Sequence, residues 1–308
     1  MENIFNKFLQ QKRVIILDGA MATELEKRGA DLNHPLWSAK ILAEQPELIK
    51  QVHLDYLKSG ADIITTASYQ ASFEGFAKYG YSEKEVVELM KLSTQLAVNA
   101  RDEAIQKGII KSPEPLIAAS VGPYGAMLAD GSEYKGNYGI DIKALKNFHR
   151  RRMQTLLESG ADLLACETIP CADEAIALVE LLAEFPHAQA WISFSCKDER
   201  HVSSGENFAD CIRIVNQTVQ VAAVGVNCTS PVYISSLLRI ASTVTGKPLL
   251  VYPNKGETWD ALHKCWLAGA GNNNFSEQAL QWFNAGASLI GGCCRTTPED
   301  IRSLKQIF

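Results

Sequence analysis

The chain has 308 residues, of which 46% are hydrophobic and 21% are charged, and its formal net charge is -5. This is the composition of a globular protein, and the acidic balance leaves no basic footprint for nucleic acid. The N-terminus lacks the features of a secretory signal, and no apolar run is long enough to cross a membrane. We therefore expect a cytoplasmic protein with small-molecule partners, whose eight cysteines are free, metal-bound or catalytic rather than disulfide-paired.

Three segments of the chain resemble one another, at residues 57–64, 157–164 and 283–290. Each combines the end of a helical pattern, a glycine and a short apolar run. The glycine suits the left-handed residue that ends many helices, and the apolar run suits a strand buried on both faces of a parallel sheet. The sequence therefore predicts a repeated helix–strand unit.

Eight apolar runs fit this template as strands, at residues 14–17, 63–66, 116–121, 163–166, 190–194, 221–226, 249–252 and 288–291. Helical patterns lie between them or close the chain, at 46–58, 83–107, 142–159, 173–184, 208–217, 232–243, 277–284 and 298–307. Eight such alternations without a dinucleotide-binding fingerprint predict an α/β protein, a (β/α)8 TIM barrel forming one domain over residues 1–308. An open, doubly wound sheet is the alternative.

The active site of such a barrel lies where the strands end, and the residues at these positions are unusually polar. They include Asp18, residues 66–70, Ser120, Glu167, Ser193, Ser195, Asn227, Cys228, Asn254 and residues 293–294. Asp18 could instead cap the next helix, and Glu167 could form a structural salt bridge with an arginine. An unpaired carboxylate after a buried strand would be costly, so we expect Glu167 to face a cation in the barrel mouth.

Two adjacent thiols, Cys293 and Cys294, follow the last predicted strand. Neighbouring cysteines are poorly placed to bridge each other, so both need another partner. Cys228 follows the sixth strand, and three thiolates with an open fourth position form a catalytic Zn²⁺ site. We predict one Zn²⁺ per chain on these three ligands, with a redox-sensing dithiol as the alternative. The remaining cysteines are predicted to be small buried residues: Cys166, Cys171, Cys196, Cys211 and Cys265.

Three further segments have compositions that predict their setting. The connection from residue 122 to residue 139 is rich in glycine and tyrosine, and long loops at this face of a barrel commonly cover substrates. The three arginines at 150–152 are predicted to form a solvated helix face. Residues 253–257 have the composition of a turn.

The motifs Leu-Asp-Gly-Ala-Met-Ala-Thr-Glu-Leu at 17–25, Gly-Val-Asn-Cys at 225–228 and Gly-Gly-Cys-Cys-Arg at 291–295 together resemble the homocysteine S-methyltransferase family. The resemblance extends over essentially the whole chain, and residues 66–70 and 120–126 are most similar to the members that use S-methylmethionine. It implies a (β/α)8 barrel in which the three cysteines hold zinc and homocysteine sulfur is the fourth ligand. It further implies that Asp18 and Glu167 receive the ammonium group of homocysteine.

The resemblance implies transfer of a methyl group from a sulfonium donor, S-methylmethionine or S-adenosylmethionine, to the homocysteine thiolate, giving methionine. Zinc would keep the acceptor sulfur as the nucleophilic thiolate. We assign the remaining substrate contacts to five strand-end residues: Gly19, Tyr69, Gln70, Ser120 and Asn227. Tyr69, Tyr124, Tyr134 and Glu133 are candidates to surround the positive charge of the donor.

Three other functions stay open at this point. One is a betaine-dependent homocysteine methyltransferase or a selenocysteine methyltransferase, although Gln70 stands where the betaine enzymes place a tyrosine. The second is a zinc-holding or thiol redox protein without turnover, which would have no use for an amino-acid pocket. The third is a metal-free lyase or aldolase, whose Schiff-base version is disfavoured because no lysine stands at the strand ends.

Overall fold

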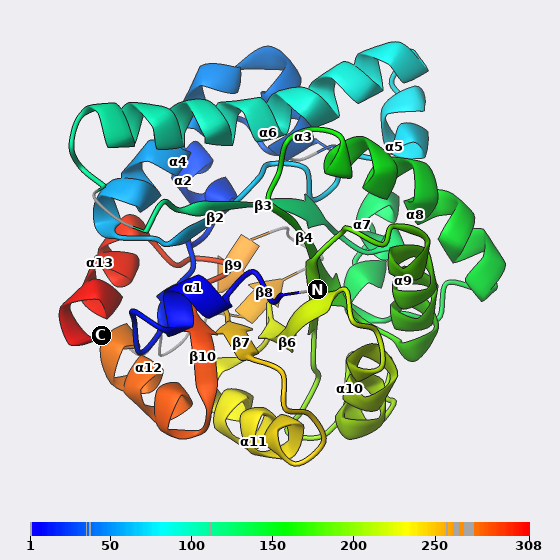
Figure 1. Ribbon diagram of the computed structural model, residues 1–308. Coiled ribbons are helices and arrows are strands. Elements are labelled where there is room, and N and C mark those ends of the chain that lie inside the picture. The colour runs from blue at the N-terminus through cyan, green and yellow to red at the C-terminus, as the bar shows by residue number, and fades with distance from the viewer. Residues whose placement is uncertain are drawn as a thin grey trace.

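The computed structural model describes residues 2–34, 36, 38–110, 113–256, 258–260, 265–267 and 274–308. Its main sheet contains eight parallel strands: β1 (Ile15–Ile16), β2 (Ile63–Thr65), β3 (Leu116–Val121), β4 (Leu163–Ile169), β5 (Ala190–Phe194), β6 (Val221–Asn227), β7 (Leu249–Tyr252) and β10 (Ala287–Ile290). Their order is β1-β10-β7-β6-β5-β4-β3-β2, and a parallel bridge between Leu17 and Ile63 joins the two edges. The predicted TIM barrel is confirmed (Figure 1).

Helices surround this sheet (Figure 1). Those predicted are α4 (Pro46–Ser59), α6 (Glu83–Gln106), α8 (Ile142–Leu157), α9 (Ala172–Glu184), α10 (Phe208–Asn216), α11 (Pro231–Ser242), α12 (Phe275–Asn284) and α13 (Pro298–Ile307). Local chemistry fixes several of their starts: α6 begins with a reciprocal capping box between Ser82 and Glu85. None of the described helices combines the length and apolar character needed to cross a membrane.

Several shorter elements were not predicted. They are α1 (Asn6–Leu9), α2 (Met21–Lys27), α3 (Ser38–Glu44), α5 (Phe73–Ala77), α7 (Tyr124–Leu128), the 3-10 helix η1 (Ser132–Tyr134) and an antiparallel hairpin of β8 (Thr258–Asp260) with β9 (Cys265–Leu267). One or two helical turns contain too few residues for a hydrophobic period to stand out from chance.

The predicted repeats are visible in the backbone. Gly60, Gly160 and Gly286 have φ angles of 105°, 90° and 108°, the left-handed conformation that glycine adopts without a steric penalty. In the first two repeats, the aspartate two residues later binds the start of a neighbouring strand. The carboxylate of Asp62 accepts a hydrogen bond of 2.9 Å from the backbone of β1, and Asp162 accepts one of 2.8 Å from that of β3. The repeated sequence thus ties adjacent strands at the N-terminal end of the barrel.

The strand residues alternate between two apolar layers. Ile15 and Leu17 belong to the cluster inside the barrel, whereas Ile16 between them belongs to the layer under the helices. Phe5 and Phe8 from the N-terminal segment complete the inner cluster. The same segment bonds to residues at the start of β5 and β6, so α1 closes the N-terminal end of the barrel, across which it lies in Figure 1.

The prediction of a solvated arginine face on α8 is wrong for Arg152, which is only 1% exposed. Consecutive helix residues point about 100° apart, so a run of three charges places one of them inward. The guanidinium of Arg152 donates hydrogen bonds to the backbone carbonyls of Gly122, at 2.7 Å, and of Ser68, at 2.9 Å. It also bonds the carbonyl of Tyr69. Arg152 therefore joins the segments that follow β2 and β3.

Candidate active site

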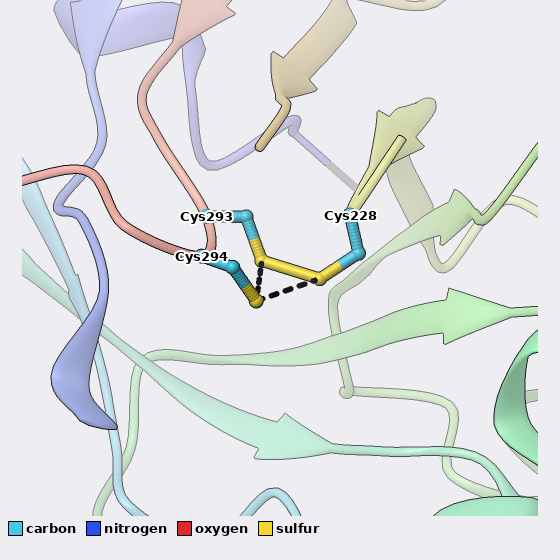
Figure 2. Close-up of side chains that lie close together, drawn as sticks. All are labelled: Cys228, Cys293 and Cys294. Atoms are coloured by element: carbon cyan, nitrogen blue, oxygen red, sulfur yellow. Dashed lines mark hydrogen bonds between the residues drawn. A yellow bond between two sulfur atoms is a disulfide. The ribbon is translucent and has the colours of Figure 1, made fainter. Parts of the chain in front are cut away.

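The three predicted cysteine ligands meet at the C-terminal end of the barrel. Cys228 follows β6, Cys293 and Cys294 follow β10, and their sulfur atoms all lie within 4.8 Å of one another. The sulfur of Cys294 lies 4.0 Å from each of the other two. Figure 2 shows Cys228 and Cys293 joined as a disulfide, with their Cα atoms 5.6 Å apart.

This pairing departs from the expectation that all of these cysteines are unpaired. Backbone positions that direct two thiols at one metal ion also bring the thiols within the Cα separation of a disulfide. Only the reduced form can bind a metal, because the thiolate is the ligand. Three thiolates around zinc at bond lengths of about 2.3 Å would be separated by about 3.8 Å, close to the 4.0 Å between Cys294 and its neighbours. The donor set therefore fits zinc.

Non-glycine residues with left-handed backbone conformations adjoin this cluster. The φ angles are 46° at Cys228, 71° at Arg295 and 61° at Thr168. Such conformations are costly for residues with a Cβ atom and persist where surrounding contacts hold them. At Thr168 these contacts come from Asn227, which accepts the Thr168 backbone N–H at 2.7 Å and donates to its hydroxyl at 2.8 Å.

Asp18 lies at the barrel mouth directly after β1 and is 7% exposed. The alternative that it caps the next helix is wrong, because α2 begins at Met21 after Ala20 and without a side-chain cap. Its carboxylate instead accepts hydrogen bonds from Thr65, at 2.7 Å from the backbone N–H and 3.2 Å from the hydroxyl. Burial raises the pKa of Asp18 to about 8 despite these bonds, and the charge of Glu167 contributes to the rise.

Glu167 is 8% exposed, on the C-terminal part of β4. It forms no ion pair with any residue that the structure describes, so a structural salt bridge is not its role. The hydroxyls of Ser120 and Tyr252 donate to its carboxylate, and burial raises its pKa to about 7 against their opposing effect. The charge of Arg152 also lowers the pKa of Glu167, but without forming an ion pair with it. Two buried carboxylates that form no ion pair among the described residues and lie close enough to repel suit a guest cation.

Three other residues predicted to contact substrate make contacts within the protein instead. Ser120 holds Glu167, and Asn227 holds Thr168 while also accepting a bond of 2.8 Å from Ser193. The polar atoms of Asn227 are thus used within the protein. Gly19 packs closely against Tyr56 and Thr296, because a Cβ added to it would lie 2.9 Å from atoms of both residues.

Tyr69 and Gln70 lie on the segment after β2, beside the mouth. Tyr69 bonds Thr168, and burial raises its pKa well above the usual value, with smaller contributions from the charges of Tyr134 and Glu133. Gln70 donates to the carbonyl of Ala126 at 3.0 Å, while its buried Oε1 has no hydrogen-bond partner. That oxygen is free to accept a bond from a ligand.

Sequence reasoning missed Tyr252, the last residue of β7. Its hydroxyl lies 2.7 Å from the hydroxyl of Ser193, accepts a bond of 3.0 Å from the indole of Trp191, and also bonds Glu167. It links the carboxylate pocket to the barrel interior. Tyr252 ends its strand and does not follow it, so its position in the sequence gives no signal that it belongs to the mouth.

Among the remaining cysteines, the prediction of buried residues is confirmed for Cys166, Cys171, Cys196 and Cys211. Cys265 stands at the start of β9, and its side chain lies outside the described residues. The turn predicted at 253–257 has no helix or strand in its described part, residues 253–256.

The chain is similar to known proteins over nearly its whole length. The family model described as homocysteine S-methyltransferase matches residues 15–308. The homocysteine S-methyltransferase YbgG of Bacillus subtilis is 53% identical over 98% of this chain and 96% of its own. The selenocysteine Se-methyltransferase of Brassica oleracea is 50% identical over 94% of this chain and 87% of its own.

Solved structures agree with these sequence matches. The metallated form of the homocysteine methyltransferase MmuM from Escherichia coli superimposes with a TM-score of 0.90 at 44% identity, over 99% of both chains. Its oxidized form gives a TM-score of 0.91 at 44% identity, over 100% of both chains. Fold, site and relatives together define a methyltransferase built on a TIM barrel. More particularly, this chain belongs to the homocysteine S-methyltransferase family. The alternative of a thiol protein without turnover is thereby set aside.

Proposed function

We propose that this homocysteine methyltransferase is zinc-dependent and takes its methyl group from a sulfonium donor, S-methylmethionine, to form methionine. The observation that carries the proposal is the meeting of three cysteine sulfurs, within 4.8 Å, at the barrel end that also holds the buried, unpaired Asp18 and Glu167. The first group suits a metal that binds a substrate thiol, and the second suits an ammonium group. Homocysteine carries both functions, and we assign its binding to the single barrel domain of residues 1–308.

Asp18 and Glu167 would bind the ammonium group of homocysteine. Thr65 fixes the first carboxylate, and Ser120 fixes the second with Tyr252. Each carboxylate is therefore oriented before the substrate arrives. The ammonium charge would stabilise the ionised forms of both groups and lower their raised pKa values.

Cys228, Cys293 and Cys294 would hold the zinc ion in the reduced protein. Burial raises the pKa of the Cys294 thiol to about 12, and the charges of Glu167 and Glu133 add to the rise. A cation is therefore needed for this thiol to ionise at neutral pH. When bound, zinc keeps its sulfur ligands, including that of the substrate, as thiolates.

The reaction itself asks little acid–base chemistry of the protein. The sulfur of homocysteine displaces a neutral thioether from the methyl carbon, so no proton has to reach the leaving group. The chain fixes the acceptor by its ammonium group and its sulfur. It also aligns the donor so that the methyl carbon lies in line between the acceptor sulfur and the departing sulfur. Cytoplasmic location belongs to the proposal too, because a reducing compartment keeps the three cysteines available as ligands.

One observation favours a second acceptor. The Brassica relative, at 50% identity, is named a selenocysteine Se-methyltransferase. Selenium and sulfur are both soft ligands of similar size, so the same three thiolates could serve either acceptor. We therefore include selenocysteine among the acceptors to be tested.

The proposal is tested by measuring zinc in the purified, reduced protein beside methionine formation from homocysteine. S-methylmethionine, S-adenosylmethionine and betaine are offered separately as donors. We expect one zinc per chain and the highest activity with S-methylmethionine. Activity with betaine as the only effective donor would overturn the assignment of a sulfonium donor. Full activity in zinc-free protein would overturn the proposed dependence on zinc.

A further inference from the structure

One oxygen of Glu133 is left without a partner. This residue lies in η1, within the long connection after β3, and its Oε2 atom is buried without a hydrogen-bond partner. Burial raises the pKa of the carboxyl above its usual range, although its own backbone N–H and the charge of Lys135 oppose the rise. A desolvated carboxylate oxygen with no partner is a costly feature unless a ligand completes it.

The surroundings of Glu133 favour a cation as that ligand. The 3-10 helix η1 that carries Glu133 packs beside β4, the strand that carries Glu167, and the ring of Tyr69 lies against Gly122, where the same connection begins. Burial raises the pKa values of Tyr69 and Tyr134, and the charge of Glu133 adds a smaller contribution to both. The cluster is therefore rich in negative groups and aromatic rings. Aromatic faces combined with a carboxylate attract positively charged sulfur and nitrogen groups that cannot donate hydrogen bonds.

The connection that carries Glu133 is firmly anchored. The buried carboxylate of Glu174 accepts the backbone N–H of Tyr124 at 2.6 Å and the hydroxyl of Tyr138 at 2.9 Å, at two ends of this segment. It also bonds His149 at 2.8 Å. The backbone of η1 packs closely on α7, because a Cβ added to Gly125 would lie 2.4 Å from the amide nitrogen of Glu133. Glu133 is thus positioned by the fold rather than carried on a free loop.

Tyr124 serves this anchoring and not the mouth. Its ring packs against Tyr138 and Phe148, with centroid separations of 5.2 and 5.0 Å. Of the residues considered for the charge of the donor, Tyr69, Tyr134 and Glu133 therefore remain. They lie on the segments after β2 and β3, whereas the sulfur ligands follow β6 and β10.

We infer that Glu133 is the residue that recognises the positive charge on the sulfur of the methyl donor, with Tyr69 and Tyr134 as the aromatic walls. The inference rests on the proposed sulfonium chemistry. It divides the carboxylates of the mouth by substrate: Asp18 and Glu167 serve the ammonium group of the acceptor, and Glu133 serves the donor. Glu133 carries out no bond-making step.

The test compares E133Q with D130N in the zinc-loaded enzyme. Glutamine keeps the shape of the side chain and removes the charge. Asp130 is exposed on the same connection, and its carboxylate accepts the N–H of Ser132 at 2.9 Å, a bond that asparagine can keep. We expect E133Q to raise the KM for S-methylmethionine roughly 10-fold or more, with the KM for homocysteine and the zinc content changed less than about 2-fold. D130N should leave all three near the wild-type values.

A neutral analogue separates recognition of charge from recognition of shape. Homoleucine has CH in place of the sulfonium and keeps the rest of S-methylmethionine. We expect E133Q to change its inhibition constant less than about 2-fold, because only the charge contact is lost. If E133Q weakened the binding of homoleucine and of S-methylmethionine equally, the inference would be overturned. Glu133 would then recognise the shape or the ammonium group of the donor.

E133D supplies a second variant, which keeps the charge, and should hold the donor KM within about 3-fold of wild type. A rise equal to that of E133Q would overturn the inference, as would an unchanged donor KM in E133Q. These outcomes are distinct from failure of the proposed function, which would appear as wild-type enzyme that does not turn over S-methylmethionine.

Discussion

The two ends of the barrel differ in how they satisfy the carboxylates that contact their strands. At the N-terminal end, Asp62 binds the backbone of β1 and pairs with Lys12, and Asp162 binds the backbone of β3 and pairs with Arg101 at 3.4 Å. At the C-terminal end, Asp18 and Glu167 accept bonds from hydroxyl and backbone donors but form no ion pair among the described residues.

The apolar surface is divided in the same way. Helix α1 covers the N-terminal end with Phe5 and Phe8, while the C-terminal end holds the cysteine cluster and the unpartnered oxygens of Gln70 and Glu133. The polar groups at the N-terminal end are paired within the protein, whereas several at the C-terminal end are open to a ligand. Residues at the first end should therefore govern stability and residues at the second should govern activity.

The largest effect is expected from C294S. Loss of one thiolate from a three-cysteine site should remove zinc and lower kcat/KM at least about 10⁴-fold. C211A, which truncates a buried cysteine of α10, is the matched control and should keep one zinc per chain and most of the activity. Elemental analysis and methionine formation measure both. Full zinc content in C294S would exclude that residue as a ligand.

The comparison of the two ends is tested most directly by D18N and D62N. D18N removes a binding charge at the mouth and should lower kcat/KM for homocysteine about 10³-fold. D62N breaks the bond to β1 and the pair with Lys12, so it should unfold at lower denaturant concentration with a KM near that of wild type. If both variants lost activity to the same extent without a difference in stability, the division between the ends would be wrong.

The pH dependence of stability provides a third test. The pKa of Asp18 rises from 3.8 to about 8 on folding, so the folded protein binds more protons than the unfolded chain between these pH values. The free energy of unfolding of the ligand-free protein should therefore fall as the pH rises through this window. D18N should be more stable than wild type at pH 8, on the order of 5 kcal/mol, and most of the difference should disappear near pH 4. Chemical denaturation across this range measures it, and a constant difference would contradict the assignment.

The smallest effect concerns the arginines of α8. R152K should lose the forked bonds to the carbonyls after β2 and β3, which lowers the free energy of unfolding by about 2 kcal/mol. Arg151 is the matched neighbour: it pairs with Glu83 at 2.8 Å on the outer face, and R151K should change stability by less than about 0.5 kcal/mol. Equal losses in the free energy of unfolding of both variants would mean that the contacts of Arg152 with the backbone carbonyls do not stabilise the fold.

The barrel could be predicted because its signals are local and repeated. A left-handed glycine such as Gly60 and an apolar run such as that of β2 each appear in the sequence as a short pattern, and eight alternations leave few topologies. The small elements escaped prediction for the converse reason. Helix α1 is a single turn whose place is set by contacts of Phe5 and Phe8 with the barrel interior, far away in sequence.

The candidate site could be predicted in its members and less in their roles. Cys228, Cys293, Cys294, Asp18 and Glu167 stand at strand ends, and a parallel barrel brings all strand ends to one mouth. Asn227 also stands at the end of a strand, yet its amide forms hydrogen bonds with Thr168 and is not open to a ligand. Position along a strand shows which end of the barrel a residue occupies, but it does not show which neighbour takes its hydrogen bonds.

By itself, the sequence determined the class of fold, the end of the barrel that acts and the thiolate and carboxylate chemistry gathered there, because these follow from periodicity and from residue type. Only the tertiary structure decided which polar groups are satisfied within the protein. Arg152 turned inward to backbone carbonyls, Glu174 bound the connection after β3, and Glu133 was left with an unpartnered oxygen. Such pairings depend on distances between segments far apart in the chain, which no local pattern of residues encodes.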